Sequence, residues 1–115
     1  MAQLNVFKTV TKILETTYTT LYTAPTGYTS IILMAQVSNI TSTTRTVTFS
    51  HYNPTGTITT ELLSGFSIPP NDAVSATTGK LVLETGQSIK ALASASSAPD
   101  NYVKVVLSIL ETSNG

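Results

Sequence analysis

The sequence contains no cysteine and few charged residues. Without cysteine the chain cannot form a disulfide, a thiolate nucleophile or a cysteine-based metal site. Only 10% of the 115 residues are charged, whereas soluble domains usually have about 25%. Six acidic and six basic residues give a formal net charge of zero. This balance argues against binding to nucleic acid or to a membrane surface, because both need a concentrated positive field.

Long apolar runs and targeting signals are also missing. The first residues, MAQLNVFKTVTK, lack the apolar region and cleavage pattern of a signal peptide. The longest apolar run, Ile31–Ala35, is far too short to span a bilayer. A chain of this length is expected to form one domain around one core.

Polarity comes from threonine and serine, alongside an apolar content of 41% that argues against disorder. A hydroxyl group can be buried with a single hydrogen bond, whereas a buried charge needs a partner. A polar but nearly uncharged surface therefore costs little to desolvate. The composition favours extensive contact with other subunits.

Apolar and polar residues alternate along most of the chain, which predicts an all-β fold. The expected strands span residues 4–14, 19–23, 30–38, 44–52, 57–63, 81–83, 88–93 and 103–109. Turn signals 8–12 residues apart are typical of β-sandwiches and barrels. We predict a jelly-roll-like antiparallel β-sandwich of about eight strands. Its expected core includes Ile31, Leu33, Val47, Phe49, Leu81, Leu83, Val105 and Leu107.

The strand at residues 30–38 is apolar on both faces, as in a central strand that is buried on both sides. The segment IPPND, residues 68–72, is predicted as a loop, because neither proline can donate a hydrogen bond to a neighbouring strand. The closing residues ETSNG are expected to form a frayed tail. These limits divide the chain into an N-terminal strand or arm (1–14), a sandwich domain (15–112) and a tail (113–115).

The N-terminal strand has two interpretations. Lys8 and Lys12 alternate with apolar residues on one face of it. On an edge strand, such lysines discourage unwanted pairing. Alternatively, the segment leaves its own domain and pairs with a neighbouring subunit.

No catalytic, cofactor-binding or metal site is predicted. His51 is the only histidine, and no nucleophile or orienting partner is evident for it, so we expect a hydrogen-bonded histidine near a strand end. The carboxylates Asp72, Glu84 and Asp100 lack the spacing of a calcium loop. Asn39-Ile40-Thr41 matches a glycosylation sequon, which we interpret as a chance match.

Three segments together resemble small virion structural proteins of tailed bacteriophages, a pattern associated most with phages of marine cyanobacteria. Residues 19–52, TTLYTAPTGYTSIILMAQVSNITSTTRTVTFSHY, match that family's order of a YTAP-x-G turn, an apolar strand, SNxT and TVTF. IPPND (68–72) and GKLVLETGQSIKALAS (79–94) match its second half, and Glu111 matches a glutamate near the end of the last strand. The resemblance covers Thr19–Glu111 and leaves the N-terminal strand outside.

The resemblance implies a non-enzymatic virion protein, assembled in the cytoplasm of the bacterial host. Composition favours contact over chemistry, so we expect a head decoration or cement protein that binds the capsid exterior. A neck, baseplate, tail or fibre component is the alternative, followed by a carbohydrate-binding or adhesin module. Expected partners are the major capsid protein or another virion protein, and further copies of the chain, with a trimer as the first expectation. The candidate docking surface comprises Leu4, Val6, Phe7, Lys8, Pro69, Pro70, Asn71 and Asp72.

Overall fold

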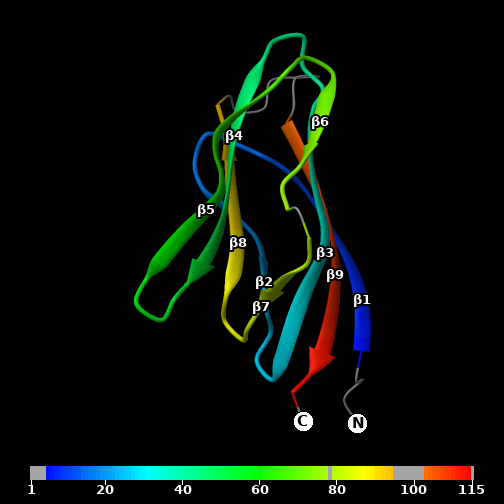
Figure 1. Ribbon diagram of the computed structural model, residues 1–115, viewed down its shortest axis with the longest axis vertical. Helices are drawn as coiled ribbons and strands as arrows, with labels where there is room; N and C mark the ends of the chain where they lie inside the picture. The colour runs from blue at the N-terminus through cyan, green and yellow to red at the C-terminus, as the bar shows by residue number, and fades with distance from the viewer. Residues whose placement is uncertain (1–4, 78, 95–102, 115) are drawn as a thin grey trace.

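The computed structural model describes residues 5–77, 79–94 and 103–114. Within these ranges the chain forms nine strands and no helix. They are β1 (Asn5–Ile13), β2 (Thr19–Thr23), β3 (Tyr28–Asn39), β4 (Arg45–Asn53), β5 (Ile58–Ile68), β6 (Asp72–Ser75), β7 (Leu81–Leu83), β8 (Ser88–Ala93) and β9 (Val103–Ser113). The molecule is elongated along the strands, with extents of 47 × 29 × 25 Å (Figure 1).

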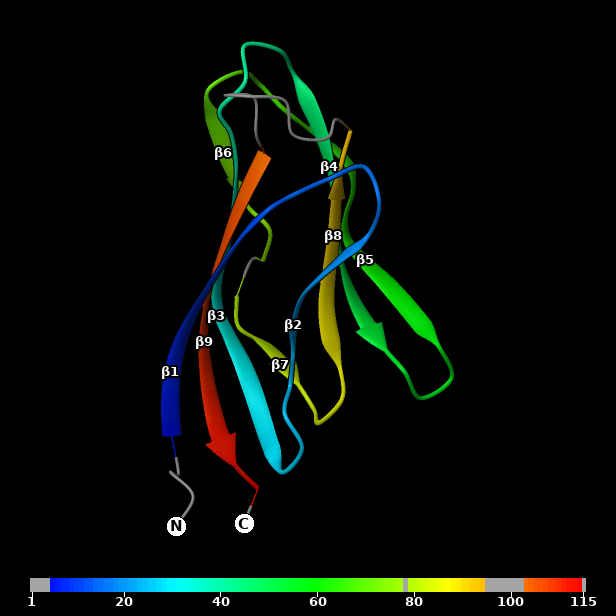
Figure 2. The ribbon, with the colours of Figure 1, turned by 180° about the vertical axis from the view of Figure 1, so that it is seen from behind.

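The strands form two antiparallel sheets that face each other. The first sheet has the order β1-β9-β3-β6, and β7 also pairs with β3. The second has the order β2-β8-β4-β5. The blue segment between β1 and β2 crosses from one sheet to the other, as Figure 2 shows from behind. The predicted all-β antiparallel sandwich is confirmed, with nine strands where about eight were expected.

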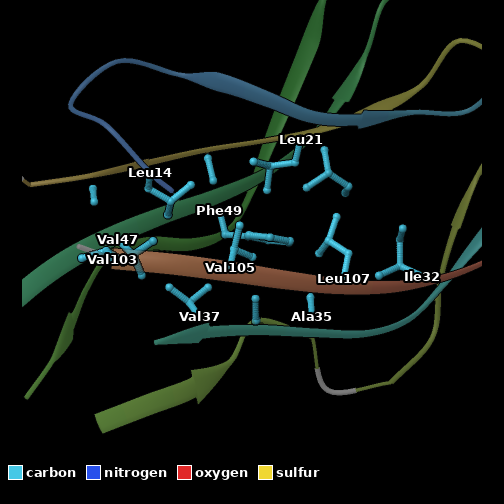
Figure 3. Packing of buried hydrophobic residues seen from close by; sticks show 14 of the residues in the cluster. Leu14, Leu21, Ile32, Ala35, Val37, Val47, Phe49, Val103, Val105 and Leu107 are labelled. Carbon is cyan, nitrogen blue, oxygen red and sulfur yellow. The ribbon is translucent and has the colours of Figure 1, made fainter. Parts of the chain in front are cut away.

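The core lies between the sheets and follows from the alternation along each strand (Figure 3). In β9 the odd-numbered residues from Val103 to Ile109 are buried, whereas Lys104 faces outward. Because successive strand residues point to opposite faces, this pattern places one face of β9 in the core. The predicted core residues Val47, Phe49, Leu83, Val105 and Leu107 are confirmed as buried.

The prediction for β3 was wrong in its phase. Ile31 and Leu33 were expected in the core, but the structure buries Ile32 there. The residues from Ile31 to Ala35 are all apolar, so they give no alternation from which to read the phase. The register with β9 also shifts between Ile32 and Met34, as at a β-bulge. Leu81, also expected in the core, is half-buried against it.

Burial on both faces of β3 was also wrong, since only its inner face is covered. Along the strand, buried positions such as Ala35 and Val37 alternate with more exposed ones, including Met34. The apolar residues on the outer side of β3 are therefore not explained by the core of a single chain.

Two further corrections concern strand ends. Of the predicted loop at residues 68–72, only Pro69, Pro70 and Asn71 lie between strands, because Asp72 begins β6 and pairs with β3. The predicted tail begins too early, since β9 continues to Ser113. Backbone hydrogen bonds with β1 and β3 hold this end of β9 in the sheet.

Candidate docking surfaces

The predicted docking residues fall into two groups at opposite ends of the molecule. Val6, Phe7 and Lys8 lie on β1, near the end marked N in Figure 1, and Leu4 lies outside the described residues. They pair with a part of β9 that in turn pairs with β3 at residues 30–32. Asp72, by contrast, pairs with Asn39 at the far end of β3. About eight residues at roughly 3.3 Å each separate the groups by about 26 Å, so they do not form one patch.

The proline loop is held by a fully buried side chain, that of Asn39. Its Nδ2 atom donates to the backbone oxygens of Ile68 at 2.9 Å and Pro69 at 3.2 Å, and to that of Thr43 at 2.9 Å. Its Oδ1 atom accepts from the backbone nitrogen of Thr41 at 2.9 Å and from its hydroxyl at 2.6 Å. One amide therefore joins the β3–β4 loop to the β5–β6 loop and fixes both.

This arrangement explains the sequon. Asn39 is 0% exposed, and its amide nitrogen already donates to backbone oxygens of two loops. The Asn39-Ile40-Thr41 pattern therefore serves loop structure, because the folded chain does not present this amide to solvent. The Thr41 hydroxyl supports the same turn, because Thr43 O, at 2.7 Å, is a second acceptor within reach of its single proton.

A second polar cluster lies at the other end, around the buried carboxylate of Glu111. The Tyr22 hydroxyl donates to Glu111 and also lies 2.7 Å from the hydroxyl of Ser30. The Lys8 ammonium lies 3.3 Å from the same carboxylate. Burial raises the pKa of the Tyr22 hydroxyl, and its hydrogen bond to Glu111 adds to the rise. The cluster connects β1, β2, β3 and β9, so it links both sheets.

Strand β1 is an edge strand of the first sheet and pairs with β9 of its own chain. Lys8 and Lys12 pair with Ile109 and Val105, which are buried, so both lysines occupy the inner side of β1. Inward-pointing charges on an edge strand discourage pairing with another edge. Exchange of this strand between subunits stays a prediction.

The outer face of the first sheet carries an apolar row that crosses four strands. Phe7 on β1 pairs with Leu110 on β9, which pairs with Ile31 on β3, which pairs with Val82 on β7. Phe7 is 74% exposed and Val82 53% exposed. Sequence reasoning selected Phe7 but missed the other three. The sequence signal that could have revealed the row was the run of consecutive apolar residues in β3, which must place apolar side chains on both sides of the strand.

The same outer face continues into an open groove of about 690 Å³ near the β3–β4 loop. Its apolar lining includes Ile13, Ile40 and Val106. Lys104 also lines it, as do Lys12 and Val105 from the inner side of the sheet. Exposed apolar residues thus occur at both ends of this face. The row and the groove therefore both place exposed apolar side chains on this face.

Among the described residues, those considered for catalysis and metal binding lie apart from these surfaces or alone. The His51 ring nitrogen Nε2 lies 3.1 Å from Oε1 of Gln87, which agrees with the expected hydrogen-bonded histidine on a strand. Among residues 5–77, 79–94 and 103–114, no group of three His, Cys, Asp or Glu side chains is placed to hold a metal ion. The same residues contain no helix that is long and apolar enough to cross a membrane.

No protein-family model matches this sequence, and no curated protein matches it. Solved structures that resemble the fold include the following two. One is a chain from the acid-stable capsid of Helicobacter pylori bacteriophage KHP30, with a TM-score of 0.56 and 12% identity over 100% of this chain and 92% of that chain. The other is a chain from Bacillus endospore appendages, described as disulfide-linked pili, with a TM-score of 0.56 and 10% identity over 97% and 88%.

At these identities the likeness establishes the fold. Both neighbours come from structural assemblies, a phage capsid and a pilus. The phage neighbour comes from a bacteriophage of Helicobacter pylori. The association with phages of marine cyanobacteria therefore stays a prediction.

Proposed function

We propose that this chain is a non-enzymatic virion structural protein of a tailed phage, and specifically a head decoration or cement protein on the capsid exterior. The observation that carries the proposal is a fold shared along its whole length with a chain from a phage capsid structure. The independent resemblance of residues 19–111 to small virion proteins points the same way. The low charge supports contact over chemistry, because uncharged surfaces are cheaper to bury.

We assign the contact with the shell to the loop end of the molecule, Pro69–Asp72. Two prolines restrict this loop, and Asn39 anchors its first residue from inside the fold. A loop fixed before binding loses less conformational entropy on binding. The N-terminal residues of the predicted docking surface lie at the opposite end, so they serve a different partner, a neighbouring copy of the chain. A trimer, with or without exchange of β1, remains our first expectation for the assembly.

Such a protein would stabilise a shell by mass action. A protein that binds only the assembled lattice stabilises it by RT ln(1 + [L]/Kd), which is about 2.7 kcal/mol per site at a hundredfold excess over Kd. Many such sites on one shell can thus add up to a large effect on the particle. No reaction at the site is required.

Particles that lack the protein provide the test. Virions from a deletion strain and complete virions are heated side by side, and release of DNA is followed. We expect the deficient particles to break at a lower temperature, and addition of the purified protein to restore the difference. A variant with Pro69 and Pro70 both changed to Ala should restore it less well. Equal breakage temperatures for deficient and complete particles would refute the clamp.

The pilus likeness favours one alternative, a subunit of a fibre or another appendage. The neck, baseplate and tail are the other positions of that kind, and an adhesin that binds carbohydrate is a further one. The number of copies per virion separates them. Hundreds of copies correspond to a head coat, whereas a handful corresponds to the neck or tail.

A further inference from the structure

We infer that the outer face of the first sheet is the surface through which copies of this chain contact one another. This outer face comprises the outward register positions Asn5, Phe7, Thr9, Thr11, Ile13, Thr29, Ile31, Met34, Gln36, Ser38, Ala73, Ser75, Val82, Lys104, Val106, Ser108, Leu110 and Thr112. The inference deepens the self-association within the proposed function and rests on it. The occupant of the face is a second copy of this chain.

The apolar row gives the face a continuous centre of contact. Phe7, Leu110, Ile31 and Val82 stand opposite one another on four adjacent strands. Cross-strand neighbours of this kind lie about 5 Å apart, so their side chains form one strip. Each exposed side chain in such a strip gains about 25 cal/mol for every Å² removed from water. Isolated exposed apolar residues need no explanation, but an aligned row on a sheet marks an interaction surface.

The sequence of β3 provides a second argument. Its central residues, 31–35, are apolar on both sides, as in a strand covered on both faces. The single chain buries the inner side, where Ile32, Ala35 and Val37 lie. On the outer side Ile31 and Met34 are apolar but not buried, and polar residues stand on either side of them along the strand. A neighbouring subunit supplies the cover for these two side chains.

The face has the size that a stable contact needs. Four strands at about 4.8 Å spacing give a width of roughly 19 Å. The 11 residues of β9, at about 3.4 Å each, give a length of roughly 37 Å. The resulting area, on the order of 700 Å², approaches the roughly 800 Å² that each partner contributes to a standard interface.

The charge pattern favours a second copy over a different protein. Among the outward positions defined above, Lys104 is the only charged residue, and it lies at the end of β9 away from the apolar row. Contacts between different proteins commonly gain specificity from complementary charges, which this face does not offer. Contacts between identical subunits are more apolar and depleted of charge at their centre. In a trimer whose threefold axis runs parallel to the strands, the apolar rows of the three copies would lie at the same height along the axis. They would then form a single apolar layer.

The test introduces a charge at the end of the row. Val82→Glu and, separately, Phe7→Glu place a carboxylate on a side chain that is already more than half exposed, so the monomer fold is expected to persist. Ile58→Glu is the matched control, because Ile58 is 55% exposed but lies on β5 of the second sheet. The mass of each full-length protein is measured by sedimentation velocity from low to high micromolar concentration. Circular dichroism and thermal melting confirm folding.

We expect the unaltered protein and Ile58→Glu to sediment as the same oligomer. Val82→Glu and Phe7→Glu should sediment at the 12.2 kDa of one chain, or need at least a tenfold higher concentration to associate. A monomeric unaltered protein would overturn the inference, as would folded Val82→Glu and Phe7→Glu proteins that keep the oligomeric mass.

Binding of the same variants to protein-deficient virions separates this inference from the proposed function. If a variant stays oligomeric but no longer binds virions, the outer face contacts the shell and not another copy. That result would overturn the inference but support the proposed function. If the variants dissociate and no form of the protein, altered or unaltered, binds virions, the copy contact is supported while the decoration role fails.

Discussion

The two faces of the first sheet both carry apolar side chains, but only the inner ones form the core of the chain. The inner face packs Ile32, Val105 and Leu107 against the second sheet, and all three are at most 2% exposed. The outer face carries Phe7 and Val82, which are mostly exposed. The difference teaches that hydrophobicity in this sequence encodes two contacts. One contact is made within the chain, and the other is one that we assign to neighbouring copies.

The most direct test of the difference between the two faces places the same charge on each side of β9. Leu107→Asp should abolish folding, because an unpaired carboxylate in the core costs several kcal/mol. Leu110→Asp, three residues away on the outer face, should fold and lose association instead. Circular dichroism and the soluble yield report the difference. A soluble Leu107→Asp protein with an unchanged melting temperature would show that the assigned faces of β9 are wrong.

A second prediction asks whether the inner side also depends on buried polar groups. Asn39→Ala should lower the free energy of unfolding by about 3 kcal/mol, because several buried groups of two loops lose their partner at about 1–3 kcal/mol each. Urea denaturation measures the loss. The control is Asn53→Ala, which removes one exposed hydrogen bond of 3.0 Å to the backbone nitrogen of Thr55. Equal effects of the two changes would contradict the anchoring role of Asn39.

A third prediction concerns alkaline pH and the Tyr22–Glu111 pair on the inner side. Burial raises the pKa of Tyr22 above its unfolded value, so the folded state retains a proton that the unfolded state loses above about pH 10. The stabilisation by this proton is therefore complete below pH 10 and declines above it, by up to about 1.4 kcal/mol per pH unit. Urea denaturation from pH 9 to 11 should show a shallower decline for Tyr22→Phe. An unchanged slope would mean that another group dominates.

The smallest expected effect is at the edge of the inner face. Lys8→Met removes the ion pair with Glu111 but leaves the hydrogen bond from Tyr22. Because the lysine side chain is 48% exposed, we expect a loss of less than about 1 kcal/mol. Lys12→Met is the control on the same side of β1, since no ion pair within the described ranges involves it. A loss several times larger for Lys8→Met would show that this pair carries the attachment of β1.

The sequence was informative wherever apolar and polar residues alternate. Val47 and Phe49 on β4, and Val105 and Leu107 on β9, were assigned to the core because apolar residues recur there at every second position. The assignment failed at Ile31 and Leu33, where consecutive apolar residues and a β-bulge leave the phase undetermined. A bulge depends on pairing with a distant strand, and a local pattern does not contain that information.

The candidate surfaces were less predictable for a related reason. Phe7 was selected as part of the N-terminal strand, but the row to which it belongs joins four strands that are distant in sequence. Glu111 was the first residue of the predicted frayed tail, and the family resemblance marked it only as a glutamate near the end of the last strand. Its burial depends on Tyr22 and Lys8, which lie about ninety or more positions earlier. Such clusters become visible only when the sheet order is known.

The pairing of β1 with β9 has a consequence for how the chain folds. Thr9 pairs with Ser108, 99 positions later. Strand β3 also pairs with β9, so its pairing in the middle of the sheet is complete only after β9 has been synthesised. Contacts so remote in sequence pay a large loop-closure entropy, and proteins dominated by them fold in milliseconds to seconds. During synthesis β1 and β3 therefore emerge from the ribosome without their main partner. Until its own β9 is made, a β1 strand is open to the β9 of another copy, so a high local concentration of chains is expected to raise the yield of exchanged assemblies.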